Sequence, residues 1–119
     1  MDKVNLAQKL KLFAETWSPK IVGELNGQQV KLAKLRGEFV WHHHEHEDEL
    51  FLVLEGRLAL HLRDRTVDLG PGEFAIVPRG VEHKPEARPE ADVLLLEPAS
   101  TVNTGNVRNE RTVAEPERI

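Results

Sequence analysis

The stretch from Trp41 to Gly56, WHHHEHEDELFLVLEG, joins a cluster of histidines and acids to an almost wholly apolar run. Neutral imidazole and carboxylate are the ligand pair that divalent Mn, Fe, Ni and Zn share, whereas a solvated loop requires no such concentration of imidazoles. We therefore interpret His42, His44 and Glu49 as ligands of one divalent metal ion. A fourth ligand, His83, is expected from a later strand.

The two-residue spacing of His42 and His44 is typical of a β-strand, in which alternate side chains share a face. We expect a strand over residues 38–44, a short acidic bend, and a second strand that begins at Glu49. If the two strands are antiparallel, the Glu49 carboxylate lies beside both imidazoles. His44 and His46 have the same spacing, so periodicity leaves that pair open as an alternative.

Length and composition limit the possible classes of protein. A chain of 119 residues suits one compact domain with a thin core, so pairing with a second copy would help and we expect a homodimer. The formal net charge of −4 and the lack of a basic stretch argue against nucleic-acid binding. No apolar run is long enough to cross a membrane. The absence of cysteine excludes disulfides, and we expect a cytoplasmic protein.

Residues 21–97 carry the signals of a β-domain. Apolar and alternating runs are separated by turn signals, beginning with an Asn26-Gly27 pair that suits a type I′ hairpin turn. Many short strands after one opening helix predict an all-β sandwich or barrel. The expected strands cover residues 21–25, 28–35, 38–44, 49–54, 57–62, 65–69, 74–77, 81–84 and 91–96.

The two ends of the chain lie outside this β-domain. Residues 1–20 are expected to contribute one short helix that packs on the barrel, spanning Asn5 to Trp17. Its apolar residues fall at spacings of four, three and four, namely Leu6, Leu10, Phe13 and Trp17. Residues 98–119 have few apolar side chains and predict an extended tail, either loose or laid over a neighbouring subunit.

Two segments resemble the conserved motifs of the cupin family, which are small β-barrels that hold one metal ion among three histidines and a glutamate. The first comprises Gly37, His42, His43, His44, Glu49 and Gly56, and the second is GEFAIVPRGVEH with Gly72, Pro78, Gly80 and His83. The resemblance covers residues 32–96. It implies a double-stranded β-helix, or jelly-roll barrel, with His42, His44, Glu49 and His83 as metal ligands.

The sequence departs from the family pattern at two places. Ala87 stands where the second motif usually has an asparagine, and one residue fewer separates Gly37 from His42. The family also leaves four residues before its glutamate, which the register starting at His42 preserves. His46 remains a substitute ligand or a partner of a ligand in this interpretation.

Four protein ligands leave coordination positions open to water or substrate, which is typical of a catalytic site. We expect a small metalloenzyme, an isomerase or an oxygenase, acting on a small polar molecule that is sugar-like or keto-acid-like. Proteins of this kind are often described as similar to mannose-6-phosphate isomerase, but no phosphate-cradling loop supports that here. The catalytic residues are unknown, because Glu38, His46, Glu47 and Arg57 qualify by position only.

Two alternatives stay open. The first is a barrel that binds or senses a metal or small ligand without turnover, since no acid and base pair can be identified. The second is a barrel that is empty in the cell and serves only assembly. His61 faces away from a leucine stripe, and we expect it to be an exposed residue without a special role.

Overall fold

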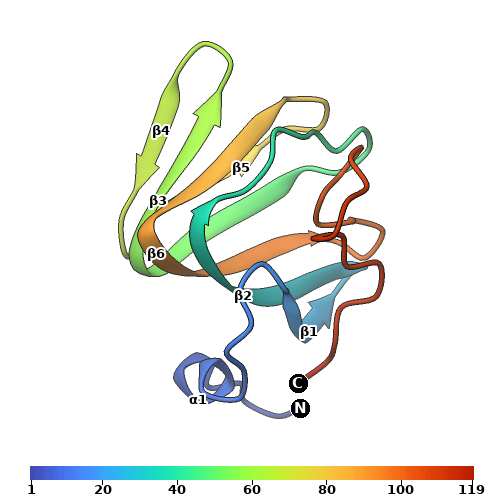
Figure 1. The fold of residues 1–119 in the computed structure, drawn as a ribbon. Helices are drawn as coiled ribbons and strands as arrows, with labels where there is room; N and C mark the ends of the chain where they lie inside the picture. The colour runs from blue at the N-terminus through green and yellow to red at the C-terminus, as the bar shows by residue number, and fades with distance from the viewer.

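The computed structural model describes residues 1–119 and consists of one short helix and six β-strands (Figure 1). Every strand pairing is antiparallel, in the order β1-β2-β6-β3-β4, and β5 pairs with the first half of β3. The elements are α1 (Leu6–Leu10), β1 (Lys20–Leu25), β2 (Gln28–Glu38), β3 (Glu49–Leu62), β4 (Thr66–Leu69), β5 (Phe74–Val77) and β6 (His83–Pro98).

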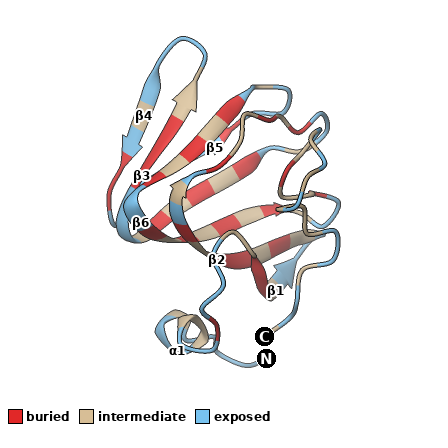
Figure 2. Ribbon diagram, in the orientation of Figure 1, coloured by how far each residue is buried: buried red, intermediate tan, exposed pale blue.

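The sheet curls on itself so that one face encloses a core (Figure 1). Buried and part-buried residues alternate along β2, β3 and β6, as expected when one face of a strand is covered (Figure 2). The all-β jelly-roll prediction is therefore confirmed, although β1 and β4 do not pair to close the sheet. The core centres on Ala33, Leu35, Phe51, Val53, Leu58, Leu60, Leu69, Val77, Ala87, Ala91, Val93 and Leu95.

Two pairs of expected strands are joined into long bent strands. Residues 49–54 and 57–62 belong to β3, and residues 81–84 and 91–96 fall largely within β6. The signal at Gly56 marks a bulge, where the register with β6 shifts, instead of a reversal. Gly56 has a φ of 84°, and a Cβ on it would lie 2.1 Å from the carbonyl oxygen of Glu90. Only glycine permits this close approach of the two strands.

The Asn26-Gly27 hairpin is confirmed, because both residues have positive φ, at 50° and 79°, as a type I′ turn requires. The expected strand over residues 38–44 is wrong. After β2 ends, only His42 is paired, in an isolated antiparallel bridge with His83. The segment is held by loops instead: the His44 carbonyl accepts from the amide of Gly80 and the His43 carbonyl from that of Asn106.

The predicted helix from Asn5 to Trp17 is far shorter in the structure. Helix α1 has five residues, none of them buried, and Asn5 caps its N-terminus through the amide of Gln8. Phe13 lies beyond the helix and is buried, while Trp17 has a φ of 57° and stacks on Phe39. Tertiary packing of these two rings thus overrides the helical spacing. The structure has no helix that could span a bilayer.

The C-terminal residues fold back onto the sheet of their own chain. Backbone hydrogen bonds tie Ile21 to Glu117 and to Ile119 beside β1. The ammonium of Lys9 donates to the Ile119 carbonyl at 2.6 Å, and Figure 1 shows the two termini side by side. Residues after Pro98 therefore cover one end of their own sheet and approach the histidine segment.

Candidate metal centre

Four side chains from three parts of the chain converge inside the curled sheet. His42 and His44 come from the irregular segment after β2, Glu49 opens β3 and His83 opens β6. All four residues are buried, with exposed fractions of 0 to 4%. One donor atom from each lies within 4.8 Å of the others, so the group could hold a metal ion. The sequence predicted this convergence residue by residue.

Backbone pairing sets two of the imidazoles side by side. The amide of His42 donates to the His83 carbonyl at 3.0 Å, and the amide of His83 donates to the His42 carbonyl at 2.9 Å. Their ring centroids are 4.3 Å apart. This reciprocal pair of hydrogen bonds replaces the predicted pairing of the histidine segment with the Glu49 strand.

Hydrogen bonds orient the same two rings. Nδ1 of His42 lies 2.9 Å from the Val40 carbonyl, and Nδ1 of His83 lies 3.0 Å from the Val81 carbonyl. A carbonyl only accepts, so each Nδ1 carries the proton and each Nε2 keeps its lone pair. This is the usual arrangement of a metal-binding imidazole.

The polar atoms at the centre have no hydrogen-bond partners. Nε2 of His83, both ring nitrogens of His44 and Oε1 of Glu49 are buried and unpaired. Oε1 of Glu49 lies 3.4 Å from Nε2 of His44 and 3.6 Å from Nε2 of His83. Buried polar atoms are rarely left unpaired, and here they face one another across a small gap. Three nitrogen donors and one carboxylate oxygen fit a borderline divalent cation.

Burial also sets the charge of the ligand groups. It lowers the pKa of His42 from 6.5 to about 4, and the neighbouring His83 adds to this effect. The imidazole is therefore neutral at pH 7. Burial raises the pKa of Glu49, but the adjacent Glu97 carboxyl group and the imidazoles of His44 and His83 outweigh it and hold this pKa well below its usual value. A neutral imidazole beside a carboxylate is the state that binds a cation.

The residues left open as alternatives lie outside the buried cluster. The side chain of His46 is 84% exposed and lies near Glu45, so it does not approach the cluster. Glu38 binds Lys84 and Glu47 binds Ser100, both at the surface. None of the four residues considered for proton transfer lines the narrow apolar cavity beside His42 and Glu49, whereas His46 and Glu47 line a second, polar cavity that reaches His44.

Sequence reasoning missed Glu97, which is 1% exposed and stands beside Glu49 across the β3–β6 pairing. Its Oε1 accepts from the Lys31 ammonium at 2.8 Å, and its Oε2 has no partner. Burial and the adjoining Glu49 carboxylate raise the pKa of Glu97 well above its usual value. In the sequence, one acidic residue directly after the apolar run 93–96 is what the exposed end of a strand would also show. No local signal therefore distinguished Glu97 as buried.

The prediction that His61 is simply exposed is wrong. Its side chain is 21% exposed, and Nε2 lies 2.8 Å from Oε1 of Glu86. Nδ1 lies 3.0 Å from the Thr66 hydroxyl. His61 therefore links β3 to both β4 and β6. Thr66 lies directly opposite it in the β3–β4 register, and Glu86 lies two residues along β6 from Lys84, its register partner.

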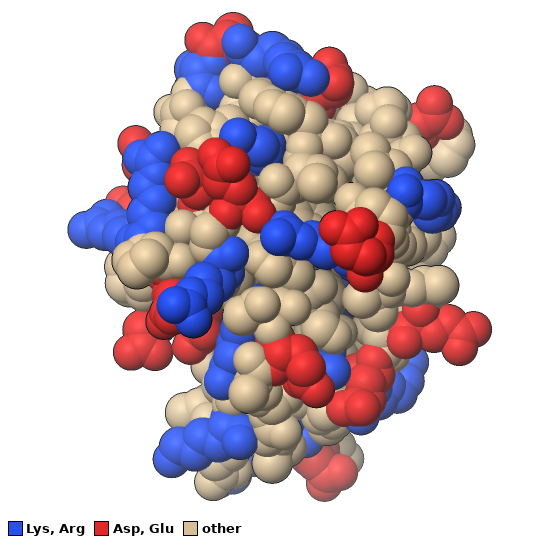
Figure 3. Space-filling view, viewed as in Figure 1, with Lys and Arg blue, Asp and Glu red and all other residues tan.

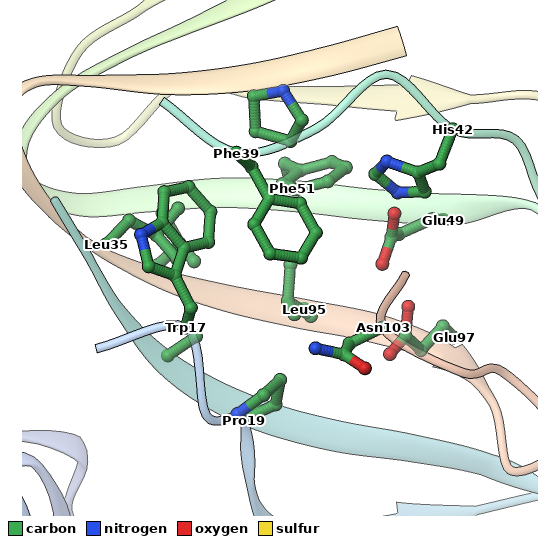
Figure 4. Close-up of a pocket in the computed structure, with 13 residues that line it drawn as sticks. Trp17, Pro19, Leu35, Phe39, His42, Glu49, Phe51, Leu95, Glu97 and Asn103 are labelled. Carbon is green, nitrogen blue, oxygen red and sulfur yellow. The ribbon is translucent and has the colours of Figure 1, made fainter. Parts of the chain in front are cut away.

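A narrow cavity adjoins the cluster, with about 40 Å³ accessible to the centre of a water-sized molecule. Figure 4 shows His42, Glu49 and Glu97 at one end, the rings of Phe39 and Phe51 in the middle, and Trp17 at the far end. This cavity is one of two hollows that reach the cluster. The second, about 280 Å³, is polar and lies over His44.

The C-terminal segment holds the histidine segment in place. The amide of His43 donates to Oδ1 of Asn106 at 2.8 Å, and the amide of Asn106 donates to the His43 carbonyl at 3.0 Å. Gly105 has a φ of 56°, and a Cβ there would lie 2.2 Å from the His43 carbonyl oxygen and 3.1 Å from the His42 ring. Glycine is required for this contact.

Gly105→Ala should therefore destabilise the protein by about 3 kcal/mol, from the left-handed backbone and the forced separation of the two segments. Gly72→Ala is the matched control, because Gly72 has a φ of 83° but no atom within 4 Å of the place that the new methyl group would take. It should cost about 1 kcal/mol. Urea unfolding of both variants measures the difference, and equal losses would contradict the close contact.

The surface of the molecule is mixed in charge on the face drawn in Figure 3. Figure 3 shows lysines and arginines interspersed with acids over the visible face, without a broad patch of one sign.

Comparison with known proteins agrees with this geometry. The family model described as "Cupin domain" matches residues 28–97, which include most of the sheet. The chain belongs to the cupin family. All four clustered residues of this cupin lie inside the matched region, from His42 to His83.

Solved structures of similar proteins share the fold. A cupin-2 domain containing protein from Shewanella frigidimarina is 45% identical, with a TM-score of 0.78 over 80% of this chain and 93% of its own. Protein NMB1881 from Neisseria meningitidis is 32% identical, with a TM-score of 0.75 over 82% of this chain and 100% of its own. KdgF from Halomonas sp. is 26% identical, with a TM-score of 0.61 over 67% and 76% of the two chains.

Among curated proteins, the uncharacterized protein YdbB of Bacillus subtilis is 41% identical over 64 residues. The match covers 53% of this cupin and 57% of YdbB, so the chain spans little more than half the length of that relative. These likenesses support the fold and the family.

Proposed function

We propose that this cupin holds one divalent metal ion, Mn, Fe, Ni or Zn, between His42, His44, Glu49 and His83, and acts as a small metalloenzyme. The observation that carries the proposal is the convergence of four buried side chains, whose ligand atoms lie within 4.8 Å of one another and, in His44, Glu49 and His83, have no hydrogen-bond partner. A bound metal ion of this kind polarises an oxygen of a substrate or binds dioxygen. The reaction is then an isomerisation or an oxygenation of a small oxygen-bearing molecule.

The residues of the chain would bind the metal ion, orient the imidazole rings and shield the cluster from water. The Val40 and Val81 carbonyls hold the rings of His42 and His83 with Nε2 toward the centre. The apolar walls of the cavity limit access of water, which strengthens electrostatic interactions at the cluster. Four protein ligands leave coordination positions for a substrate oxygen.

The second candidate is a barrel that binds or senses a metal or small ligand without turnover. The observation that favours it is the scarcity of proton-transfer groups: apart from His42 and Glu49, the only titratable residue that lines the narrow apolar cavity is Glu97. An isomerase requires a group that removes and returns a proton. A cytoplasmic location stays a prediction under either candidate.

Elemental analysis of the purified, dialysed protein tests the metal, and one equivalent of a single divalent metal is expected. A screen of the metal-loaded protein against sugars, keto acids and phenols, with oxygen consumption recorded, then separates the two candidates. Turnover of any of these substrates supports the enzyme, and binding without turnover supports the sensor. A protein that takes up no metal refutes the metalloenzyme and the metal sensor. If it also binds none of the screened molecules, an empty barrel that serves assembly is left.

We also infer that the chain forms a homodimer through the outer face of its sheet. The strand register aligns two rows of side chains on this face, and each row crosses β5, β3 and β6 and contains no charged residue. Phe74 and Ile76 are 60% and 56% exposed, which is unusual for large apolar side chains on one strand. A two-fold axis would bring this face against its own copy. The rows are Phe74, Leu52 and Leu94, and Ile76, Leu50 and Leu96.

Light scattering should report twice the chain mass of 13.5 kDa at micromolar concentration. Phe74→Glu combined with Ile76→Glu should reduce this to the mass of one chain, because each interface would bury charges without partners. Leu12→Glu is the control, since Leu12 is 65% exposed but outside the rows, and it should leave the dimer intact. A wild-type monomer would contradict the inference.

A further inference from the structure

The walls of the cavity beside the cluster carry information about the molecule that it admits (Figure 4). Five of the lining side chains are aromatic or leucine, namely Trp17, Leu35, Phe39, Phe51 and Leu95. The rings of Trp17 and Phe39 stack with centroids 4.5 Å apart, which keeps this wall flat and rigid. Such walls stabilise an apolar body and offer no hydrogen bonds to it.

No lysine or arginine lines the cavity. The buried Lys31 is already bound to Glu97 at 2.8 Å, and both side chains are 2% exposed. Arg111 lies 5.7 Å from the Trp17 and Phe39 ring centroids, but it is outside the lining and donates to the Glu38 carbonyl. A carboxylate or phosphate that entered the cavity would therefore have no partner except the metal, and its burial would be costly.

Few neutral polar groups are available either. Beyond the cluster itself, the lining offers the Asn103 amide and the Glu97 carboxyl, and Oε1 of Glu97 is already committed to Lys31. A sugar brings several hydroxyl groups, and each one buried without a partner weakens binding. The volume open to the centre of a water-sized molecule is only about 40 Å³, which limits the size of the molecule that the cavity can admit.

We propose that this cavity takes a small uncharged molecule with an apolar body, which offers one or two oxygens to the metal, in place of a keto acid, a sugar or a sugar phosphate. This proposal rests on the proposed function, because the polar end of the molecule needs the metal ion. It narrows the substrate class to compounds such as short-chain hydroxyketones.

Three probes that share a four-carbon ketone chain test the proposal with Co²⁺-loaded protein, whose visible spectrum reports ligands that reach the metal. They are 1-hydroxy-2-butanone, which is neutral and mostly apolar; 2-oxobutanoate, its anionic keto-acid counterpart; and erythrulose, its polyhydroxylated counterpart. 1-Hydroxy-2-butanone should bind at least about tenfold more tightly than either of the others. In free solution the anion 2-oxobutanoate is the better metal ligand. Tighter binding of 1-hydroxy-2-butanone to the protein would therefore show the effect of the apolar cavity walls.

A pair of variants tests whether the apolar part of the probe binds inside the cavity. Leu35→Ala enlarges the wall and should raise the affinity for the longer probe 1-hydroxy-2-hexanone about tenfold. Leu69→Ala is the matched control, because Leu69 is equally buried, at 5%, but does not line the cavity, and it should change nothing. Both variants are compared only after each is shown to bind one equivalent of Co²⁺.

The outcomes separate the two proposals. Tighter binding of 2-oxobutanoate or erythrulose, or no spectral response to 1-hydroxy-2-butanone while Co²⁺ is bound, overturns the neutral-substrate proposal and leaves the metal site standing. Failure to bind Co²⁺ at all refutes the proposed function, and this inference with it. Equal effects of Leu35→Ala and Leu69→Ala would show that the probe does not occupy this cavity.

Discussion

His83→Ala should abolish stoichiometric metal binding, reducing one equivalent of metal to near zero after dialysis. His83 is fully buried and supplies one of the three nitrogens at the centre, so its loss leaves an incomplete donor set. Loss of a partner that only supports a ligand already costs about 10- to 100-fold in affinity, and loss of a ligand should exceed that. Elemental analysis and competition with a coloured chelator measure the effect.

His46→Ala is the matched control, because His46 belongs to the same histidine cluster in the sequence but its side chain is 84% exposed. Its metal content and affinity should equal those of the wild type. If His46→Ala lost metal while His83→Ala retained it, the ion would be bound by the exposed acidic bend and the buried cluster would not be the site. Circular dichroism of both variants verifies that the sheet is intact.

Lys31→Met should reduce the free energy of unfolding by about 3–5 kcal/mol, because it leaves Glu97 buried without its cation. The Lys31–Glu97 pair is 2.8 Å long with both side chains 2% exposed, so solvent does not screen it. Lys31→Met combined with Glu97→Leu should be close to the wild type, since an apolar pair of similar volume carries no desolvation cost. Urea unfolding in the presence of a chelator measures the protein without a contribution from bound metal.

The loss in Lys31→Met should also depend on pH. Burial and the Glu49 carboxylate raise the pKa of Glu97 above its usual 4.5, and Lys31 partly offsets this rise. Lys31→Met removes the offset, so its folded state keeps the Glu97 proton to a higher pH than the folded wild type does. Such a group destabilises the fold progressively as pH rises through this window. The deficit of Lys31→Met relative to the wild type should therefore grow from mildly acidic to neutral pH, whereas the double variant should show no such trend. A deficit independent of pH would show that lost packing, not the uncompensated charge, is the cause.

Much of the fold was accessible from local patterns. Alternating apolar residues, the Asn26-Gly27 turn and the glycine and proline signals predicted an all-β jelly roll, and the structure confirms it. The spacing of two motifs predicted that His42, His44, Glu49 and His83 would meet, and they do so within 4.8 Å. Their role as metal ligands stays a proposal.

Other features depended on contacts between distant segments. The turn signal at Gly56 is a bulge inside β3, because β6 lies against it along both halves. The helix predicted from the apolar spacing of Leu6 to Trp17 ends at Leu10. Beyond it, Phe13 is buried and Trp17 stacks on the Phe39 ring, and these contacts replace the helix.

The order of side chains along the chain determined which residues could share a face, and so most of the strands and the hairpin could be inferred without coordinates, and the spacing of the two motifs indicated which four residues would meet. Only the folded chain decided which strand stands beside which, and therefore that Glu97 faces Glu49, that Lys31 neutralises it and that Gly105 lies against His43. Spacing is a local property, whereas burial and charge compensation arise between residues far apart in the sequence, 66 positions in the case of the Lys31–Glu97 pair.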